Sequence, residues 1–164
     1  MKGITPPALN SSSMTTGSFV LPWGMLTLTV GPRGLTRVAF DGPPAPPLTG
    51  PWAEALAGYL AGQPLPDLPV DLDGVPPFTH RVLEACRAIP FGTTTGYAAL
   101  GRSLGLPRAA RAVGQALARN PVPVVIPCHR VVGADGRLTG FSAPGGVAAK
   151  RRLLQREGVL KKTL

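Results

Sequence analysis

Cysteine and histidine are scarce in this chain, whose 164 residues include two of each: Cys86, Cys128, His80 and His129. Two cysteines exclude a disulfide framework, and the four residues lack the CxxC or HxxxH spacing typical of zinc sites. Long apolar runs are also missing, which excludes a membrane span, and residues 1–17 lack the apolar core of a signal peptide. We therefore expect no metal, no other cofactor, no membrane partner and a cytoplasmic location.

Acidic residues are few and unevenly placed. The net charge is +9, but residues 1–77 hold three basic and five acidic residues, a net of −2. Residues 78–164 hold fourteen basic and three acidic residues, a net of +11. Such asymmetry indicates that the second half binds a polyanion, with nucleic acid the first candidate and an anionic membrane surface the second. A solvated basic face is the alternative.

Glycine and proline are abundant, at 21 and 20 residues, yet 44% of the chain is hydrophobic, which is enough for a core. We expect the excess in tails and linkers of a two-domain α/β protein. We expect a flexible tail over residues 1–17, a small N-terminal domain over 18–75 and a C-terminal domain over 76–164. In the N-terminal domain, two strands over 18–30 and 35–40 form a hairpin, and a short helix ends at Gly62.

Helical periodicity dominates the C-terminal domain. A first helix, FTHRVLEACRAIP, places Cys86 on its apolar face, which predicts a small core residue. The segment GTTTGYAALGRSLG predicts a Thr-capped helix that ends at Gly105, and Pro107 opens a second helix that ends before Pro121. Two short helices joined by Gly-Leu-Pro indicate a helix-turn-helix.

Beyond this pair, GADG predicts a tight turn and RLTGF a strand over residues 137–141. A final helix buries Val147, Leu153 and Leu154 and ends at Gly158.

The second helix of the pair has two different faces. Its apolar side comprises Ala110, Val113, Gly114 and Leu117. Its other side carries cations, one amide and one small residue: Arg108, Arg111, Ala112, Gln115 and Arg119. We expect the cationic side to bind DNA, where the small Ala112 lets the helix backbone approach closely.

Cys128 and His129 are adjacent, between Pro127 and Arg130. Neighbouring side chains on a strand face opposite ways, so the two share a site only if the chain turns here, as Pro127 favours. A bridging water then links thiol and imidazole, and Arg130 helps to lower the pKa of the thiol. The alternative is a buried structural cysteine beside a hydrogen-bonded histidine.

Glu157 lies in the last turn of the final helix, where the helix dipole disfavours an anion. A residue placed against its local preference indicates a distant partner, and a carboxylate that orients a histidine is the usual way to build an activated base. An ordinary ion pair with Arg151 or Arg152 is the alternative.

Three segments of the second half together resemble the O6-alkylguanine-DNA alkyltransferases, also called methylated-DNA-protein-cysteine methyltransferases. These segments are IPFGTTTGYAALGRSLGLPRAARAVGQAL, NPVPVVIPCHRVVGADGRL and KRRLLQREG. The similarity covers residues 78–158, and residues 18–75 match that family's N-terminal domain in outline. The resemblance implies a mostly helical, winged helix-turn-helix-like domain that both binds DNA and transfers the alkyl group.

The resemblance also implies the roles of individual residues. Cys128 takes the alkyl group from O6 of a flipped-out guanine in double-stranded DNA, His129 activates it through water, Glu157 assists and Asn120 organises the turn beneath the site. Transfer is irreversible and happens once per molecule. Tyr97 contacts the base and the rotated phosphate, and Arg111 fills the gap left by the base. The helix that carries Arg111 enters the minor groove, where the small Ala112 and Gly114 let its backbone come close to the DNA. Backbone groups of Cys128, Val131 and Ser142, together with Phe141, line the guanine pocket. A monomer suffices for this chemistry.

The chain departs from the family pattern at two places. Gly96 stands where serine is common, and residues 140–146 form a segment two residues longer, with Phe141 in place of a tyrosine.

Two other functions are alternatives to alkyl transfer. A non-catalytic sensor of damaged DNA lacks the nucleophile that Cys128 supplies here, and a helix-turn-helix regulator needs a palindromic target and a dimer interface.

Overall fold

The structure is a computed structural model that describes residues 14–141 and 146–160. The chain divides into two compact units between Asp73 and Gly74. Most of the predicted tail, residues 1–13, lies outside the described residues.

The first unit is built on a three-stranded antiparallel sheet of order β1-β2-β3. Its strands are β1 (Thr15–Leu21), β2 (Gly24–Gly31) and β3 (Gly34–Phe40). The single strand predicted over residues 18–30 is therefore wrong, because the chain turns at Pro22 and Trp23, and proline has no N–H to give to a ladder. The tail boundary at residue 17 is also wrong, since Thr15 and Thr16 pair with Val30 and Thr29.

Pro-rich connectors cover the outer strands of this sheet. At β1, the Ser18 N–H donates to the carbonyl of Pro46 at 2.8 Å. At β3, the Leu35 N–H donates to the carbonyl of Pro69 at 2.9 Å. Leu48 and Asp71 of these connectors donate back to the carbonyls of Ser18 and Leu35, so the connectors occupy backbone groups of both edges that could otherwise pair with another chain.

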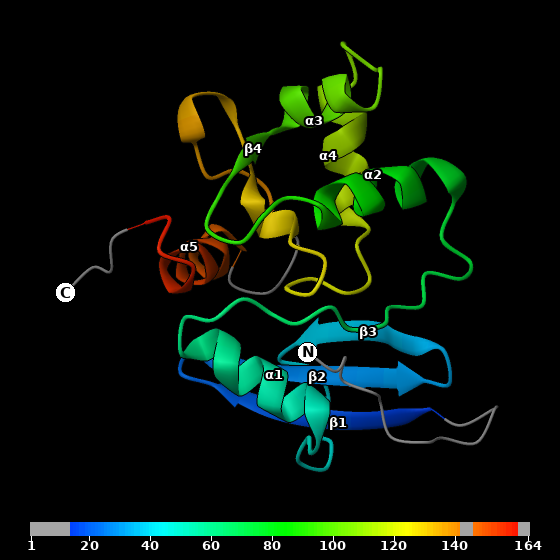
Figure 1. Ribbon diagram of the computed structural model, residues 1–164, viewed down its shortest axis with the longest axis vertical. Coiled ribbons are helices and arrows are strands. Elements are labelled where there is room, and N and C mark those ends of the chain that lie inside the picture. The colour runs from blue at the N-terminus through cyan, green and yellow to red at the C-terminus, as the bar shows by residue number, and fades with distance from the viewer. Residues whose placement is uncertain (1–13, 142–145, 161–164) are drawn as a thin grey trace. The chain divides into compact units, whose positions relative to one another are not determined.

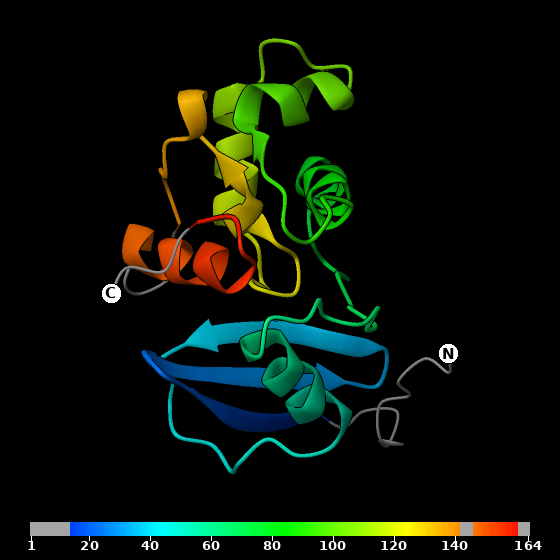
Figure 2. The same ribbon diagram turned by 60° about the vertical axis from the view of Figure 1, so that its left-hand side comes forward.

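Helix α1 (Pro51–Leu60) runs across one face of the sheet in both ribbon views (Figure 1, Figure 2). Its buried residues recur at helical spacing: Trp52, Ala55, Leu56 and Tyr59. The opposing core side chains of the strands include Leu26, Leu28 and Leu35, all at most 1% exposed. This amphipathic pattern is what the sequence predicted for the helix that ends before Gly62.

The described part of the second unit is mostly helical, with two short strands. Its elements are α2 (Pro77–Arg87), β4 (Thr95–Gly96), α3 (Tyr97–Ser103), α4 (Ala110–Ala118), the 3-10 turn η1 (Cys128–Arg130), β5 (Val131–Val132), the 3-10 turn η2 (Ala134–Gly136) and α5 (Gly146–Arg156). Strands β4 and β5 pair in parallel, and α3 packs against α4 (Figure 1). The mixed α/β class and the helix pair agree with the sequence prediction.

The turn between α3 and α4 differs in detail from the prediction. No threonine caps α3, because Gly96 occupies its N-cap without a side-chain hydrogen bond. Pro107 does not open α4 either, since the chain turns between Leu106 and Ala109 before the helix begins at Ala110. The turn also needs a glycine at position 101, where a Cβ would come within 2.9 Å of the Leu106 carbonyl.

The strand predicted over residues 137–141 is absent. The Gly133 N–H donates to the Arg137 carbonyl at 2.7 Å and closes the predicted turn, but β5 pairs with β4 instead of with the returning chain. The Thr139 carbonyl receives side-chain donors rather than a ladder hydrogen bond.

Helix α5 buries Ala149, Lys150, Leu153 and Leu154. Val147, which the sequence analysis placed in the core, is 39% exposed, because the buried stripe passes through positions 149, 150, 153 and 154 instead. Within the described residues, no helix combines the length and the apolar character that crossing a membrane requires.

Candidate active site

Cys128 begins the 3-10 turn η1, directly after Pro127, so the chain does turn at the position where the sequence predicted it. Asn120 shapes the loop that leads into this turn. Its Nδ2 donates to the Ile126 carbonyl at 2.9 Å, and its Oδ1 accepts from the Val122 N–H at 3.0 Å. The Asn120 side chain also lowers the pKa of the Cys128 thiol, so it acts on both the loop and the thiol.

A pocket opens beside the thiol, with about 340 Å³ of space that includes open solvent. Its walls come from α3, α4, η1, the segment before residue 142 and α5: Tyr97, Gly114, Leu117, Ala118, Cys128, Gly140, Phe141 and Lys150. Gly114 keeps one wall thin, because a Cβ there would lie 3.7 Å from the Tyr97 ring. The site therefore offers a cysteine to a small group that enters from outside.

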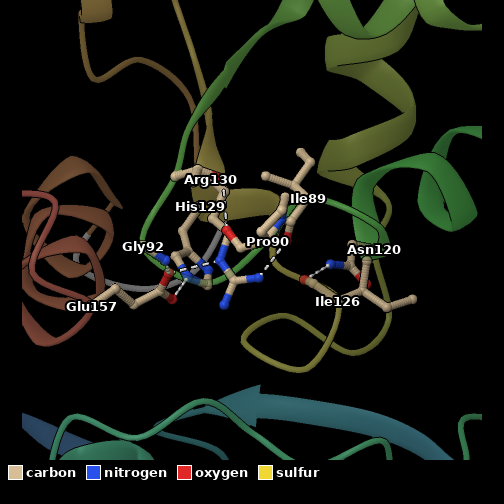
Figure 3. Close-up of polar contacts among 9 residues, drawn as sticks. Ile89, Pro90, Gly92, Asn120, Ile126, His129, Arg130 and Glu157 are labelled. Carbon is tan, nitrogen blue, oxygen red and sulfur yellow. Dashed lines mark hydrogen bonds and ion pairs between the residues drawn. The ribbon is translucent and has the colours of Figure 1, made fainter.

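His129, the residue after Cys128, is fully buried and contacts the carboxylate of Glu157 (Figure 3). Its Nε2 lies 2.5 Å from Glu157 Oε2. Since a carboxylate only accepts, this contact places the ring proton on Nε2 and leaves the lone pair on Nδ1. The expected distant partner of Glu157 is thus His129, from a segment 28 residues away.

Arg130 holds the other carboxylate oxygen of Glu157. Its Nε donates to Oε1 at 2.7 Å, and the Gly92 N–H approaches the same oxygen at 3.4 Å. The guanidinium also donates to the Ile89 carbonyl at 2.7 Å and stacks 5.7 Å from the Phe91 ring centre. Arg130 is therefore turned toward Glu157, and its expected task of lowering the thiol pKa falls instead to Asn120 and Lys150.

Burial shifts the pKa values of both reactive groups toward their uncharged forms. Burial raises the pKa of the Cys128 thiol above its ordinary value, against the opposing effects of the Asn120 hydrogen bond and the Lys150 charge. Burial also lowers the pKa of His129, although Glu157 opposes that change. A protonated thiol beside a neutral imidazole is the arrangement in which the histidine can act as a base.

Tyr97 and Lys150 meet at a single backbone oxygen. The Tyr97 hydroxyl donates to the Thr139 carbonyl at 3.0 Å, and Lys150 Nζ donates to the same carbonyl at 2.7 Å. Lys150 Nζ also donates to the Val131 carbonyl at 2.6 Å and lies 5.7 Å from the centre of the Tyr97 ring.

The remaining predicted residues are distributed around the pocket. Phe141 lines it, with a backbone φ of 98° that non-glycine residues rarely adopt. Val131 is fully buried in β5 and contributes its carbonyl to Lys150, and Ser142 lies outside the described residues. The polar face of α4 presents exposed side chains: Arg111, Ala112 and Gln115. Arg108 is exposed before the helix begins, and Gly114 faces the pocket.

Four pocket residues were missed as site residues: Leu117, Ala118, Gly140 and Lys150. For Lys150 the sequence did hold a signal, because helical spacing puts it on the face of Leu153, Leu154 and Glu157, where a cation is out of place. Leu117 is a buried core residue, as predicted, and it also forms part of the pocket wall. In the described part of the chain, no three His, Cys, Asp or Glu residues are grouped to hold a metal.

The chain is similar to known proteins over most of its length. A family model, the DNA-binding domain of 6-O-methylguanine DNA methyltransferase, matches residues 77–159. A methylated-DNA-protein-cysteine methyltransferase of Salmonella typhimurium is 43% identical over 129 residues, which cover 78% of this chain and 71% of the relative. A protein of Thermus thermophilus named DNA base-flipping protein is 42% identical, over 85% of this chain and 97% of the relative.

A solved structure extends the likeness to the fold. The crystal structure of Mycobacterium tuberculosis OGT in complex with DNA has a TM-score of 0.77 and 36% sequence identity. The match covers 87% of this chain and 92% of that one, so it spans both units.

Proposed function

The chain belongs to the methylated-DNA-protein-cysteine methyltransferase family, and we propose that it repairs DNA by moving the alkyl group of an O6-alkylguanine onto its own Cys128. The observation that carries this proposal is a cysteine that opens into a pocket in front of a buried His129–Glu157 pair. The substrate is alkylated double-stranded DNA, the protein acts as a monomer, and the location is the cytoplasm.

The site supports a direct displacement at the alkyl carbon. The thiol proton passes through one water to Nδ1 of His129, whose Nε2–H stays on the ring and donates to Glu157. The sulfur then forms a bond to the alkyl carbon as the bond to O6 breaks, and the electron pair goes to the guanine oxygen. Glu157 stabilises the imidazolium, and Arg130 pairs with the carboxylate and holds it in place. The product thioether has no leaving group that water could use.

The exposed face of α4 supports DNA binding. Arg111 and Gln115 are exposed on this face, and the small side chain of the exposed Ala112 leaves room for close approach of the DNA. Gly114 belongs to the same helix and lines the pocket, so a base that leaves the duplex at α4 has a short path to Cys128.

Intact-mass spectrometry tests the proposal. After incubation with excess duplex that contains one O6-methylguanine, we expect each protein molecule to gain the mass of one CH₂ group and no more, with the adduct at Cys128. A protein that binds this duplex tightly and gains no mass is a base-flipping binder. That second candidate is favoured by the relative named DNA base-flipping protein, which this chain matches over nearly its full length.

Replacement of Arg111 by alanine should slow transfer from duplex DNA about tenfold or more at saturating DNA, and should leave transfer from free O6-alkylated guanine base unchanged. Extrusion of a base costs a few kcal/mol, and a side chain that occupies the vacancy offsets part of that cost. Free base needs no extrusion. Single-turnover rates measure both reactions.

Arg119→Ala is the matched control, because Arg119 is exposed just beyond the end of α4. It should weaken DNA binding without changing the saturated rate. An Arg111→Ala protein whose saturated duplex rate equals that of the wild type would make Arg111 a phosphate contact only.

A further inference from the structure

Helix α5 has an outer face whose charges all have one sign, here named the α5 cationic face. Its residues recur at helical spacing: Ala148, Arg151, Arg152, Gln155 and Arg156. Ala148, Arg151 and Arg152 are exposed, and the other two are half-buried. The sequence of α5 contains no acidic residue. Because a helix face that is only solvated ordinarily mixes both signs, a face of one sign indicates an anionic partner.

The energetics of the helix explain only part of this face. The helix dipole favours a cation in the last turn, which accounts for Arg156. Arg151 and Arg152 lie before that turn, and Arg152 and Arg156 have the i, i+4 spacing at which like charges destabilise a helix. On α2, by contrast, the exposed Arg81 is followed three residues later by the exposed Glu84. The arginines of α5 therefore conflict with local preference, which indicates a use outside the helix.

The α5 cationic face points away from the pocket at Cys128. Lys150 lines that pocket, and each further residue turns by about 100°, so Arg152 lies about 160° around the helix from Lys150. Helix α5 packs against η1, whereas α3 packs against α4. In both ribbon views α5 and α3 lie at opposite ends of the second unit (Figure 1, Figure 2). The face is thus a surface separate from the helix-turn-helix.

We propose that the α5 cationic face is a second DNA-binding surface, which holds the phosphate backbone of another DNA segment while α4 holds the first. This inference rests on the proposed binding of DNA at α4. Arginine suits the partner, because its planar guanidinium binds a phosphate through two hydrogen bonds and is more weakly hydrated than an ammonium. Contacts to phosphates carry no sequence information, so this surface binds any duplex.

Two DNA surfaces change how the protein moves between DNA segments. With two surfaces, it passes from one segment to the next through an intermediate in which both segments are bound. With one surface, it must leave the first segment before it binds the second. Direct passage keeps the protein on DNA while it searches for a rare alkylated base. The rate at which the protein leaves one duplex should therefore rise with the concentration of a second.

Stopped-flow exchange tests this expectation. The protein is bound to a fluorescent duplex without damage and is mixed with increasing excess of the same duplex without label. For the wild type, we expect the release rate to rise in proportion to the competitor concentration. In the double variant Arg151→Gln/Arg152→Gln, the slope of that rise should fall about fivefold or more, because two phosphate contacts are lost. The rate extrapolated to zero competitor should not change.

Arg33→Gln/Arg37→Gln is the matched control. It removes two exposed arginines from the first unit and changes the net charge by the same amount. The ion pairs of Arg33 with Asp71 and Asp73 are exposed, so their loss costs little stability. The control should keep the wild-type slope, and both double variants should still gain one alkyl group per molecule at saturating damaged duplex.

Three results would overturn the second surface. One is a wild-type release rate that does not depend on the competitor, and another is a wild-type slope in Arg151→Gln/Arg152→Gln. The third is a double variant that keeps the slope but no longer binds vesicles containing phosphatidylserine, which would assign the face to an anionic membrane.

Failure of the proposed function has a different outcome. A protein whose release rate rises with competitor, but which gains no alkyl group from damaged duplex, would overturn alkyl transfer and leave the second surface in place. A protein that gains the alkyl group at Cys128, but is released at a constant rate, would overturn the second surface alone.

Discussion

Replacement of Cys128 by alanine should abolish alkyl transfer altogether and leave DNA binding intact. The thiol is the nucleophile, and its removal leaves no thiol among the residues that line the pocket, since Cys86 is fully buried on α2. The exposed side chains of α4 that we expect to contact DNA do not include Cys128. Intact mass and a binding titration on the same duplex measure the two properties separately.

Cys86→Ala provides the matched control. Cys86 is fully buried on α2, and burial raises the pKa of its thiol far above the ordinary value, so it stays a protonated core residue. The Cys86→Ala protein should therefore gain one alkyl group per molecule, as the wild type does. Transfer that survives in Cys128→Ala, or is lost in a folded Cys86→Ala, would contradict the assignment of the nucleophile.

The turn at Cys128 and the contact between His129 and Glu157 could be predicted from local sequence. Pro127 before Cys128 and His129 favours a turn, and only a turn allows neighbouring side chains to share one site. Glu157 could be found because an anion at a helix C-terminus is out of place. In both cases a residue conflicts with its local structural preference, and the conflict indicates the site.

The parts that failed depend on partners that are distant in the sequence. The segment over residues 137–141 has strand-like composition, but Tyr97 and Lys150 take the Thr139 carbonyl that a ladder would need. Arg130 was expected to act on Cys128, its neighbour in the chain, whereas in three dimensions the nearest carboxylate, Glu157, determines where its guanidinium lies. The periodicity of apolar residues in the sequence predicts neither the contacts of the Thr139 carbonyl nor those of Arg130.

The N-terminal unit shows the same limit in its sheet. Alternation of apolar residues predicted strand structure across residues 18–30, and the strands do lie there, but Pro22 divides them into two. The pairing of Thr15 with Val30 follows from that division, because the turn at residues 22 and 23 sets the register. A composition rich in Ser and Thr concealed the start of β1.

Substitution of Glu157 by glutamine should slow transfer at pH 7 by roughly 10²- to 10⁴-fold, the range that general-base catalysis supplies. Arg130 and Gly92 both donate to Oε1, so the glutamine places its carbonyl oxygen on their side and its NH₂ group against His129. Because that NH₂ only donates, Nε2 of His129 must accept, and the ring proton moves to Nδ1. The histidine is then in the tautomer that cannot take the thiol proton.

The pH dependence distinguishes this cause from a general loss of structure. Burial raises the pKa of the Cys128 thiol, so at neutral pH ionisation needs the base, whereas at alkaline pH the thiolate forms without it. The deficit of Glu157→Gln should therefore be largest near neutral pH and shrink as the pH rises toward the thiol pKa. Single-turnover rates on free O6-alkylated guanine measure this profile, with thermal unfolding as a check on folding and Glu84→Gln, an exposed residue of α2, as the matched control. A deficit that stays constant at every pH would show that Glu157 does not act through His129.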